Sequence, residues 1–456
     1  MILQENIAAI STPPGVGGVA IIRISGENPL SVLEKMFRPA GKTQVKAFEP
    51  YRLYPGVIEA DGFFDQGMAV YFRSPHSYTG EDVVEIHCHG GIAIQRGVLQ
   101  KTFSLGCRPA ERGEFTRRAY LNGKMSLSSS EGLNEMIHAE TTELVKAGYR
   151  LYREKLYNAI EKLRKDLTFT LAKIDAEIDF PEEGLEEVSD PEIAAELTAA
   201  ADRLSALAET YRSGSYVKSG VRVALLGRPN TGKSSLLNAI LGREKAIVTD
   251  VAGTTRDVVE GEIALSGVKF IFSDTAGLRN AEDAVEKIGV DLAKKTALSA
   301  DVVLVLTEDS DDAFTDEVIA ERKKEGGETL FLVNKSDLPG AEARAEKVRK
   351  KYGEEPLVLS AKTGEGVPDL TGRLCKIALS GKADPEIGYL TERRHYEKIV
   401  AAKEILYRAA SAVGTETPDL IAQDIDEAWS LLGEITGATA PDEVIDEIFS
   451  KFCVGK

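Results

Sequence analysis

The chain has 456 residues, of which 43% are hydrophobic and 28% charged, and its formal net charge is −17. This length predicts two to four domains. No apolar run of about 18 residues is present, which excludes a membrane-spanning helix, and no basic segment precedes an apolar core at the start, so we expect no signal peptide. The negative net charge also excludes a protein that binds nucleic acid over its whole surface, because such a surface is basic.

The distribution of charge along the chain and the spacing of the cysteines indicate how the protein can contact RNA and in which compartment it lies. Residues 1–124 hold 14 Lys and Arg against 12 Asp and Glu, a net charge of about +2, which leaves about −19 for the remainder. We therefore expect any contact with RNA to be local or delegated to a partner. The cysteines are too far apart to indicate a disulfide framework or a zinc cluster, which favours a reducing cytoplasm. They are Cys88, Cys107, Cys375 and Cys453.

Residues 1–124 are predicted to form a mixed α/β domain. Strands are expected at 7–11, 18–24, 68–72 and 83–87, and helices at 29–36 and 93–105. His87 and His89 flank Cys88, but on a strand the two histidines face one way and the cysteine the other. Because the pattern offers no third ligand, we reject a zinc site here.

Charged and apolar residues alternate at helical spacing through residues 125–216, which predicts the first part of a helical domain. Pro181 and Gly184 are expected to break this pattern, and Ser213-Gly214-Ser215 is predicted to be a linker. Helical spacing returns in residues 379–456, where Trp429 is predicted to lie in the core. The expected helical stretches are 143–157, 160–178, 190–211, 391–413, 420–435 and 441–449.

Between these segments, residues 217–378 alternate strand and helix, which predicts a mostly parallel, doubly wound sheet. The strands are expected at 221–226, 262–265, 269–273, 302–306, 329–333 and 356–359. The simplest architecture is a Ras-like domain inserted into one discontinuous helical domain, because insertion is tolerated where domain termini lie close together. Two separate helical domains are the alternative.

The octapeptide at residues 227–234, Gly-Arg-Pro-Asn-Thr-Gly-Lys-Ser, fits the pattern of a phosphate-binding loop between a strand and a helix. Its glycines let backbone N–H groups converge on phosphate oxygens, and the helix N-terminus adds a partial positive charge. Lys233 is predicted to reach the β and γ phosphates, and the Ser234 hydroxyl to ligate Mg²⁺. Taken alone, the pattern also fits an ordinary Gly-rich turn.

Three further motifs follow in the order expected of a GTP-binding domain. Asp274 is predicted to hold Mg²⁺ through water, and the Gly277 amide to sense the γ-phosphate. Asp337, in the Asn-Lys-Ser-Asp motif at 334–337, is predicted to accept hydrogen bonds from the N1–H and 2-amino groups of guanine, which selects GTP over ATP. Ser360-Ala361 follows the last strand, where a backbone N–H can meet the guanine O6.

Together the motifs predict a Mg²⁺-dependent GTPase, with Lys233 and Asp274 acting in catalysis and Thr255 completing the Mg²⁺ shell beside Ser234. The predicted GTP-binding residues are Asn230, Thr231, Gly232, Lys233, Ser234, Ser235, Thr249, Thr254, Thr255, Asp274, Thr275, Ala276, Gly277, Asn334, Lys335, Asp337, Ser360 and Ala361.

Leu278 stands where many small GTPases place a Gln that orients the attacking water. A leucine cannot hold water, so another group is expected to do so: a residue further along the switch, a partner or an ion. Arg228, Arg256 and Arg279 are candidates for an arginine finger, and their alternative role is solvated charge on the switch loops.

The segments that flank the central domain resemble the MnmE family of tRNA modification GTPases, also called TrmE. The resemblance covers the whole chain and rests on motifs that other GTPases with this central domain lack. They are Thr12–Gly18, Arg23–Gly26, Tyr78–Asp82, His89–Gly91, Arg108–Phe115, Leu121–Lys124 and the terminal Phe452–Lys456.

The resemblance implies an N-terminal folate-binding and dimerisation domain (1–124) like that of folate-dependent aminomethyltransferases, a helical domain in two parts (125–216 and 379–456) and an inserted G domain (217–378). It further implies that the protein is a homodimer that acts with the FAD-dependent partner MnmG, as a heterotetramer. Together they would add an aminomethyl or carboxymethylaminomethyl group to C5 of the tRNA wobble uridine. The one-carbon unit would come from a 5-formyl- or methylene-tetrahydrofolate, and the tRNA would be bound mainly through the complex.

Arg23, Glu85 and Lys124 resemble the folate-contacting positions of the family, with Lys456 in the same pocket. A pterin offers donors to Glu85, while Arg23 and Lys124 can meet anionic or carbonyl groups. The alternative is a surface ion pair or a strand-end charge. Cys453 is placed for chemistry beside the folate, although a terminal cysteine without a catalytic role is an open alternative.

In the G domain, the resemblance implies that Asn230 ligates K⁺, with Thr249, Val251 and Thr254 completing the shell. A monovalent cation between phosphates can replace an arginine finger by neutralising transition-state charge. Glu286 matches the family's water-orienting, catalytic Glu and would compensate for Leu278. Its alternative role is an ordinary carboxylate on a helix surface.

Two other functions stay open. One is a nucleotide-switched assembly factor that binds RNA, which would need a basic appendage that this acidic chain does not offer. The other is a self-sufficient folate-dependent methyltransferase with a vestigial G domain, which the complete set of GTP motifs opposes.

Overall fold

The computed structural model describes residues 5–179, 190–228, 230–242, 259–274, 284–307 and 313–456. The chain divides into two compact units. One contains residues 1–137, 148–201 and 401–456, and the other contains residues 138–147 and 202–400. Among the described residues, no helix is long and apolar enough to cross a membrane.

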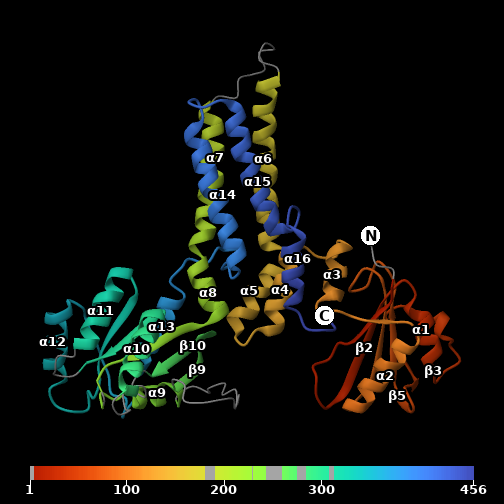
Figure 1. The fold of residues 1–456 in the computed structure, drawn as a ribbon, viewed down its shortest axis with the longest axis horizontal. Coiled ribbons are helices and arrows are strands. Elements are labelled where there is room, and N and C mark those ends of the chain that lie inside the picture. Colours follow the sequence, from red (N-terminus) through yellow and green to blue (C-terminus); the bar gives the residue numbers. More distant parts are fainter. Residues whose placement is uncertain (1–4, 180–189, 229, 243–258, 275–283, 308–312) are drawn as a thin grey trace. The chain divides into compact units, whose positions relative to one another are not determined.

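The N-terminal strands form one sheet in the order β3-β4-β5-β6-β2-β1-β7 (Figure 1). Neighbouring strands are antiparallel except β1 and β7. The bounds are β1 Ile7–Ile10, β2 Gly17–Gly26, β3 Phe37–Pro39, β4 Tyr54–Glu59, β5 Phe64–Phe72, β6 Asp82–Gly90 and β7 Arg108–Pro109. This confirms the predicted strands and adds β3, β4 and β7.

Helices α1 (Pro29–Met36) and α2 (Ile92–Ser104) contribute to the core of this domain. Asn28 caps α1, because its side-chain oxygen accepts the Ser31 amide at 3.2 Å. Cys88 is 3% exposed and belongs to the core, whereas His89 on the same strand is exposed. The predicted opposite orientation of these residues is therefore confirmed, and the described residues contain no cluster of His, Cys, Asp and Glu that could hold a metal ion.

The helical segments contain α3 Glu114–Leu121, α4 Leu127–His138, α5 Thr142–Tyr152, α6 Lys155–Asp179, α7 Asp190–Glu209, α8 Tyr211–Ser219, α14 Arg393–Ala412, α15 Pro418–Thr436 and α16 Asp442–Ser450. The predicted stretch 143–157 is not one helix, because Glu154 has a φ of 60° and the chain turns between α5 and α6. The predicted break at Pro181 and Gly184 lies outside the described residues.

Helices α6 and α15 lie side by side although they are far apart in the sequence (Figure 1). Trp429 on α15 is half-buried, which corrects the prediction that it lies in the core. Its ring lies 3.9 Å from the guanidinium carbon of Arg164, and its indole Nε1 donates to the Thr168 hydroxyl at 3.0 Å. A tryptophan suits this contact because it combines a large ring with a polar N–H group.

The predicted linker at Ser213–Ser215 is wrong, since these residues lie inside α8. A Cβ at Gly214 would collide with the carbonyl oxygen of Leu390, so the glycine permits close packing there. The Ser213 hydroxyl accepts the Gly381 amide at 3.0 Å. Glycine and serine mark flexible linkers in many sequences, but here they allow two chain segments to approach closely.

The predicted doubly wound sheet is confirmed, in the order β13-β12-β11-β8-β10-β9 (Figure 1). Its neighbouring strands are parallel except β9 and β10. The bounds are β8 Val221–Leu226, β9 Val259–Leu265, β10 Val268–Asp274, β11 Val302–Leu306, β12 Glu328–Val333 and β13 Leu357–Val358. The accompanying helices are α9 Lys233–Leu241, α10 Ala284–Ser299, α11 Ala313–Glu325, α12 Ala341–Tyr352 and α13 Val367–Ala378.

Both faces of this sheet are covered. Val223 and Leu225 of β8 join one apolar cluster, while Ala224 and Leu226 join another. Because successive side chains of a strand point to opposite faces, both clusters are filled only if β8 is apolar from Val223 to Leu226, and Arg222 near its start is exposed. The loops that follow the carboxyl ends of β8, β10 and β12 therefore meet at one edge of the sheet, where open α/β sheets bind ligands.

Candidate functional site

The phosphate-binding loop connects β8 to α9, and its glycines are required by its geometry. Gly227 and Gly232 have φ values of 146° and 92°, which L-residues with side chains rarely adopt. A Cβ would strike the carbonyl oxygen of Leu306 at Gly227 and the side-chain nitrogen of Asn334 at Gly232. The loop therefore leaves room for a ligand to approach backbone N–H groups closely, as a phosphate cradle requires.

Lys233 lies at the first position of α9 and is only 3% exposed. Its ammonium donates to the carbonyl oxygens of Gly227 and Arg228, at 2.8 and 2.7 Å. These contacts hold a positive charge across the loop beside the helix N-terminus. The arrangement suits an anionic ligand, because the lysine and the helix dipole have the same sign.

Ser234 and Asp274 are brought together because β8 and β10 are neighbours in the sheet. The Ser234 hydroxyl donates to Asp274 Oδ2 at 2.8 Å. A hydroxyl and a carboxylate side by side are oxygen donors of the kind that Mg²⁺ prefers, so this pair fits the predicted ion.

Asn334 joins the loops at the edge of the sheet. Its side-chain nitrogen donates to the Thr231 carbonyl oxygen at 2.9 Å, and its oxygen accepts the Ala361 amide at 2.9 Å. The neighbouring Lys335 ammonium donates to the Asn230 carbonyl oxygen at 3.0 Å. Residues 230–231, 334–335 and 361 thus form one connected group.

Asp337 is exposed in the loop that follows β12, so its carboxylate is accessible to the base of a nucleotide. The Ser360 hydroxyl donates to Asp337 Oδ1 at 2.6 Å and holds the pKa of the carboxyl below its ordinary value. An ionised carboxylate fixed on one oxygen accepts two hydrogen bonds from adjacent N–H groups, the pattern that guanine offers and adenine lacks.

Several predicted residues are not placed. Thr249, Val251, Thr254, Thr255, Thr275, Ala276 and Gly277 lie outside the described residues, as do Arg256, Leu278 and Arg279. Glu286 lies within α10, and only its backbone is among the described parts of the structure. Ser235 is exposed in the first turn of α9, and Arg228 is exposed in the loop.

A second cluster of charge lies on the N-terminal sheet, where Arg23 of β2 pairs directly with Glu85 of β6. Two guanidinium nitrogens of Arg23 approach Glu85 Oε1 at 2.9 and 2.8 Å, and both side chains are 15% exposed. The guanidinium also lies over the rings of Tyr78 and Phe115, 5.2 and 5.6 Å from their centres. Tyr78 and Phe115 were missed as site residues, although both lie in the motifs quoted above.

The last residues of the chain reach this cluster. The Ser11 hydroxyl donates to the Gly455 carbonyl oxygen at 3.1 Å, and Val454 forms a β-bridge with Arg112. Burial lowers the pKa of Lys456, and the charge of Arg23 lowers it further, which places the lysine near the Arg23–Glu85 pair. Cys453 is exposed, and its carbonyl oxygen accepts the Lys456 amide at 3.3 Å.

Lys124 makes different contacts. Its ammonium donates to the Pro75 carbonyl oxygen at 3.0 Å, and its aliphatic stem packs against Gly80. The structure thus brings Arg23, Glu85 and Lys456 together and gives Lys124 partners in the segment between β5 and β6.

Replacing Glu85 with Gln should reduce the pH dependence of the free energy of unfolding at acidic pH. Burial raises the pKa of Glu85, but the nearby His87, whose Nε2 lies 3.6 Å from Glu85 Oε2, and the ion pair with Arg23 outweigh it, so the pKa lies below its ordinary 4.5. Since the folded-state pKa is depressed, the ion pair stabilises the fold above the ordinary value and is lost as pH falls through the folded value. We expect Glu85→Gln to cost roughly 1–3 kcal/mol at neutral pH.

Thermal unfolding of the wild type and Glu85→Gln between pH 7 and about pH 3 measures this difference. Glu59→Gln is the matched control, because Glu59 pairs with Arg38 and Lys101 at the surface. Identical slopes for the wild type and Glu85→Gln below pH 4.5 would contradict the prediction.

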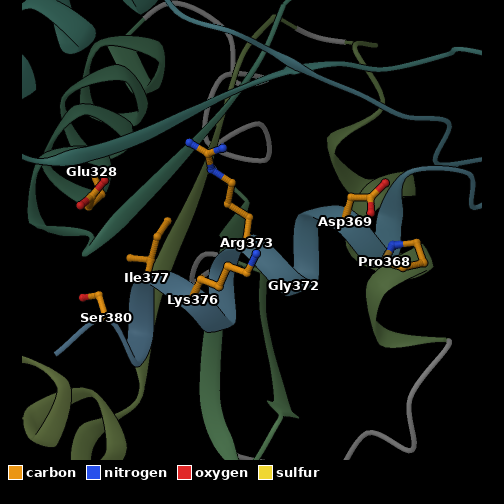
Figure 2. Close-up of a pocket in the computed structure, with 8 residues that line it drawn as sticks. All are labelled: Glu328, Pro368, Asp369, Gly372, Arg373, Lys376, Ile377 and Ser380. Atoms are coloured by element: carbon orange, nitrogen blue, oxygen red, sulfur yellow. The ribbon is translucent and has the colours of Figure 1, made fainter. Parts of the chain in front are cut away.

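A pocket of about 550 Å³ lies elsewhere on the nucleotide-binding unit (Figure 2). It is lined by Glu328, Pro368, Asp369, Gly372, Arg373, Lys376, Ile377 and Ser380. Most of these residues belong to α13, and Glu328 begins β12, at the opposite end of that strand from Asn334. None of them is a predicted nucleotide contact, so this pocket is separate from the site at the carboxyl edge.

The glycine cradle, the Ser234–Asp274 pair and the accessible Asp337, all at the carboxyl edge of a doubly wound sheet, define a GTP-binding protein of the phosphate-loop class. The family model for the MnmE helical domain matches residues 127–453, and the model for the TrmE N-terminus matches residues 6–124. The chain belongs to the MnmE (TrmE) family of tRNA modification GTPases.

Full-length relatives agree with this assignment. The chain is 38% identical to a tRNA modification GTPase MnmE of Natranaerobius thermophilus, over 99% of this chain and 100% of that protein. It is 39% identical to the protein of the same name from Fervidobacterium nodosum, over 99% and 98%. Among solved structures, the G domain of the T. maritima FeoB iron transporter is 27% identical and covers 35% of this chain and 98% of its own, with a TM-score of 0.27.

Proposed function

We propose that this chain hydrolyses GTP to gate the modification of the wobble uridine of tRNA. In this proposal it acts with the FAD-dependent partner MnmG to add an aminomethyl or carboxymethylaminomethyl group to C5. The observation that carries the proposal is the presence, in one chain of this family, of a nucleotide site and a separate Arg23–Glu85–Lys456 cluster. The nucleotide site supplies the switch, and the cluster supplies a place for the one-carbon donor.

On the nucleotide side, Lys233 would move its ammonium from the loop carbonyls to the β and γ phosphates of GTP. Asp337 would accept the N1–H and 2-amino groups of guanine, while Asn334 keeps the base loop tied to the phosphate loop. Thr231, Gly232 and the Ser360–Ala361 turn complete the proposed enclosure, with the remaining predicted contacts of the switch segments.

Ser234 and Asp274, with Thr255, are the residues proposed to hold Mg²⁺, which neutralises charge on the phosphates when bound. Asn230, with Thr249, Val251 and Thr254, is proposed to hold K⁺. Asn230 suits this role because it is exposed in the phosphate-binding loop and carries an amide oxygen. Because Leu278 cannot orient water, we assign that task to the carboxylate of Glu286.

On the other side, Arg23, Glu85 and Lys456 are proposed to bind the pterin and the anionic part of a tetrahydrofolate derivative, which supplies the one-carbon unit when bound. Glu85 is ionised at neutral pH and accepts N–H donors, while Arg23 donates from a guanidinium held over two aromatic rings. Lys124 is proposed to contact the same ligand, and Cys453 is the thiol available beside it.

We further propose that the protein is a cytoplasmic homodimer that joins through the N-terminal domains and forms a heterotetramer with MnmG. Support comes from the sheet face that carries Arg23 and Glu85, because Val19, Phe64 and Met68 on that face expose apolar side chains. Exposed apolar side chains gathered on one face mark an interaction surface. The tRNA is proposed to bind mainly through the complex, since the chain is acidic.

Gating has a direct test in solution. Small-angle scattering of the wild type with GDP, and with a non-hydrolysable GTP analogue, both in K⁺, should give two different curves, because the two G domains of the dimer would meet only in the GTP-like state. Identical curves in the two states would remove the gating proposal while leaving GTP hydrolysis unaffected.

Mass spectrometry of wobble nucleosides from cells that carry Asp274→Asn tests the function itself. We expect loss of the C5 modification, because the variant loses the carboxylate next to Ser234. Asp369→Asn, an exposed aspartate on α13, is the matched control. Normal modification in Asp274→Asn cells would favour a folate enzyme with a vestigial G domain. Normal modification in a deletion strain, with co-sedimentation of the protein and ribosomal subunits, would favour an assembly factor.

A further inference from the structure

The base-recognition loop at residues 334–340 is bordered by α12, which begins at Ala341. Arg344, in the first turn and a half of that helix, is half-buried and turns its guanidinium back onto the loop. It donates to the carbonyl oxygens of Asn334 and Lys335 at 3.3 and 3.1 Å, and to that of Pro339 at 3.3 Å. One side chain therefore ties the start of the loop to its end.

The backbone that Arg344 holds is not a relaxed one. Lys335 has a φ of 62°, an uncommon conformation for a residue with a long side chain. The Leu338 amide donates to the Lys335 carbonyl oxygen at 3.1 Å and closes a turn with Ser336 and Asp337 at its centre. The carbonyl that closes this turn is the same one that accepts Arg344.

The opposite side of the loop has its own restraints. The Ser336 amide donates to the Leu359 carbonyl oxygen at 3.1 Å, and the Ser360 hydroxyl donates to Asp337. Arg344 supplies the hold from the α12 side. A guanidinium suits this task because its donors have a fixed, planar geometry that can bind several carbonyl groups at once.

The position of Arg344 in α12 gives the helix dipole no favourable interaction with its charge. The N-terminal end of a helix carries a partial positive charge, which disfavours a cation there. Arg349, in the last turn of α12, is at the favourable end and pairs with Glu342, Glu346 and Glu355. The two arginines of one helix thus have different contacts: Arg349 binds carboxylates, and Arg344 binds the backbone of the guanine loop.

We infer that Arg344 is a positioning residue for guanine selection. By fixing the carbonyl oxygens of Asn334 and Lys335, it sets the orientation of the turn and thereby the place where the Asp337 carboxylate meets the N1–H and 2-amino groups of the base. This inference rests on the proposed role of Asp337 and adds to it a residue that does not touch the nucleotide.

The test compares the wild type with Arg344→Ala, Arg344→Lys and the matched control Arg349→Ala. The dissociation constants of GDP and of inosine diphosphate, whose base lacks the 2-amino group, are measured by titration calorimetry. For Arg344→Ala we expect GDP binding to weaken about tenfold or more, because several charge-assisted hydrogen bonds to the loop are lost. The preference for GDP over inosine diphosphate should shrink, because a misplaced carboxylate no longer distinguishes them.

Three readouts separate positioning from a general structural role. The melting temperature of Arg344→Ala should fall no further than that of Arg349→Ala. The rate of hydrolysis at saturating GTP should be retained while KM rises, because the phosphate loop is intact. Arg344→Lys should restore part of the GDP preference, since an ammonium can reach one of the carbonyls but not all.

A GDP preference in Arg344→Ala equal to that of the wild type would overturn the inference, as would weaker binding that follows only from a lower melting temperature. A wild-type protein that binds GDP and inosine diphosphate equally would contradict the proposed role of Asp337 itself. The two failures are therefore distinguishable within one set of titrations.

Discussion

Lys233→Ala is expected to lower kcat/KM for GTP hydrolysis by at least about a hundredfold, the effect of removing one charged group aimed at a transition state. Lys233 is buried, and its ammonium lies across the loop at 2.8 and 2.7 Å from two carbonyl oxygens. The positive charge is therefore already in the loop before the substrate arrives, and the proposed mechanism moves it from the carbonyl oxygens to the phosphates. Its loss would remove stabilisation of the phosphates both in binding and in the transition state.

Steady-state phosphate release with purified protein measures this effect. Lys376→Ala is the control, because Lys376 is an exposed lysine on α13 that lines the separate pocket. Circular dichroism of both variants would establish that the sheet is formed. Hydrolysis by Lys233→Ala within a few-fold of the wild type would contradict the role assigned to the loop.

Asp337→Asn is expected to exchange the nucleotide that the protein accepts. The carboxylate accepts hydrogen bonds from two N–H groups of guanine, whereas an asparagine side chain accepts one hydrogen bond through its oxygen and donates one through its nitrogen. That pattern fits xanthine, which has a carbonyl oxygen in place of the 2-amino group. We expect GTP to lose at least about a hundredfold in kcat/KM, because a site built for hydrogen bonds rejects a mismatched partner strongly.

The measurement is the ratio of kcat/KM for xanthosine triphosphate and GTP in the wild type and the variant. Leu338→Ala is the matched control, since Leu338 is the exposed neighbour of Asp337 in the same loop. A variant that loses GTP without gaining xanthosine triphosphate would show that Asp337 acts in some way other than direct contact with the base.

Local pattern was enough to predict a GTPase domain, because its parts are set by short-range rules. A strand followed by Gly227–Ser234 and a helix can form only a narrow set of turns, and the carboxyl ends of parallel strands meet at one edge. This is why Asn334 lies beside Thr231, although the two residues are 103 positions apart in the sequence.

The features that sequence reasoning missed depend on contacts between distant segments. Gly214 lies in a Ser-Gly-Ser sequence that is typical of linkers. Only the nearby Leu390 carbonyl shows that a glycine is needed there for close packing. Arg344 lies outside every recognised motif, so nothing in its neighbourhood marks it as a partner of the base loop. Lys124 is part of a recognised motif, but its contact with Pro75 depends on the path of the chain between β5 and β6, which the motif does not indicate.

The docking of the chain's end has a consequence for the order of synthesis. Gly455 lies against the Ile10 backbone, with a φ of 95° that a larger residue would rarely adopt, and Ser11 binds its carbonyl oxygen. The cluster around Arg23 therefore depends on a contact between Ser11 and Gly455, which are 444 positions apart in the sequence. The described strands and helices of the nucleotide-binding domain end at Ala378, so this domain can fold before the segment around Gly455 has been synthesised.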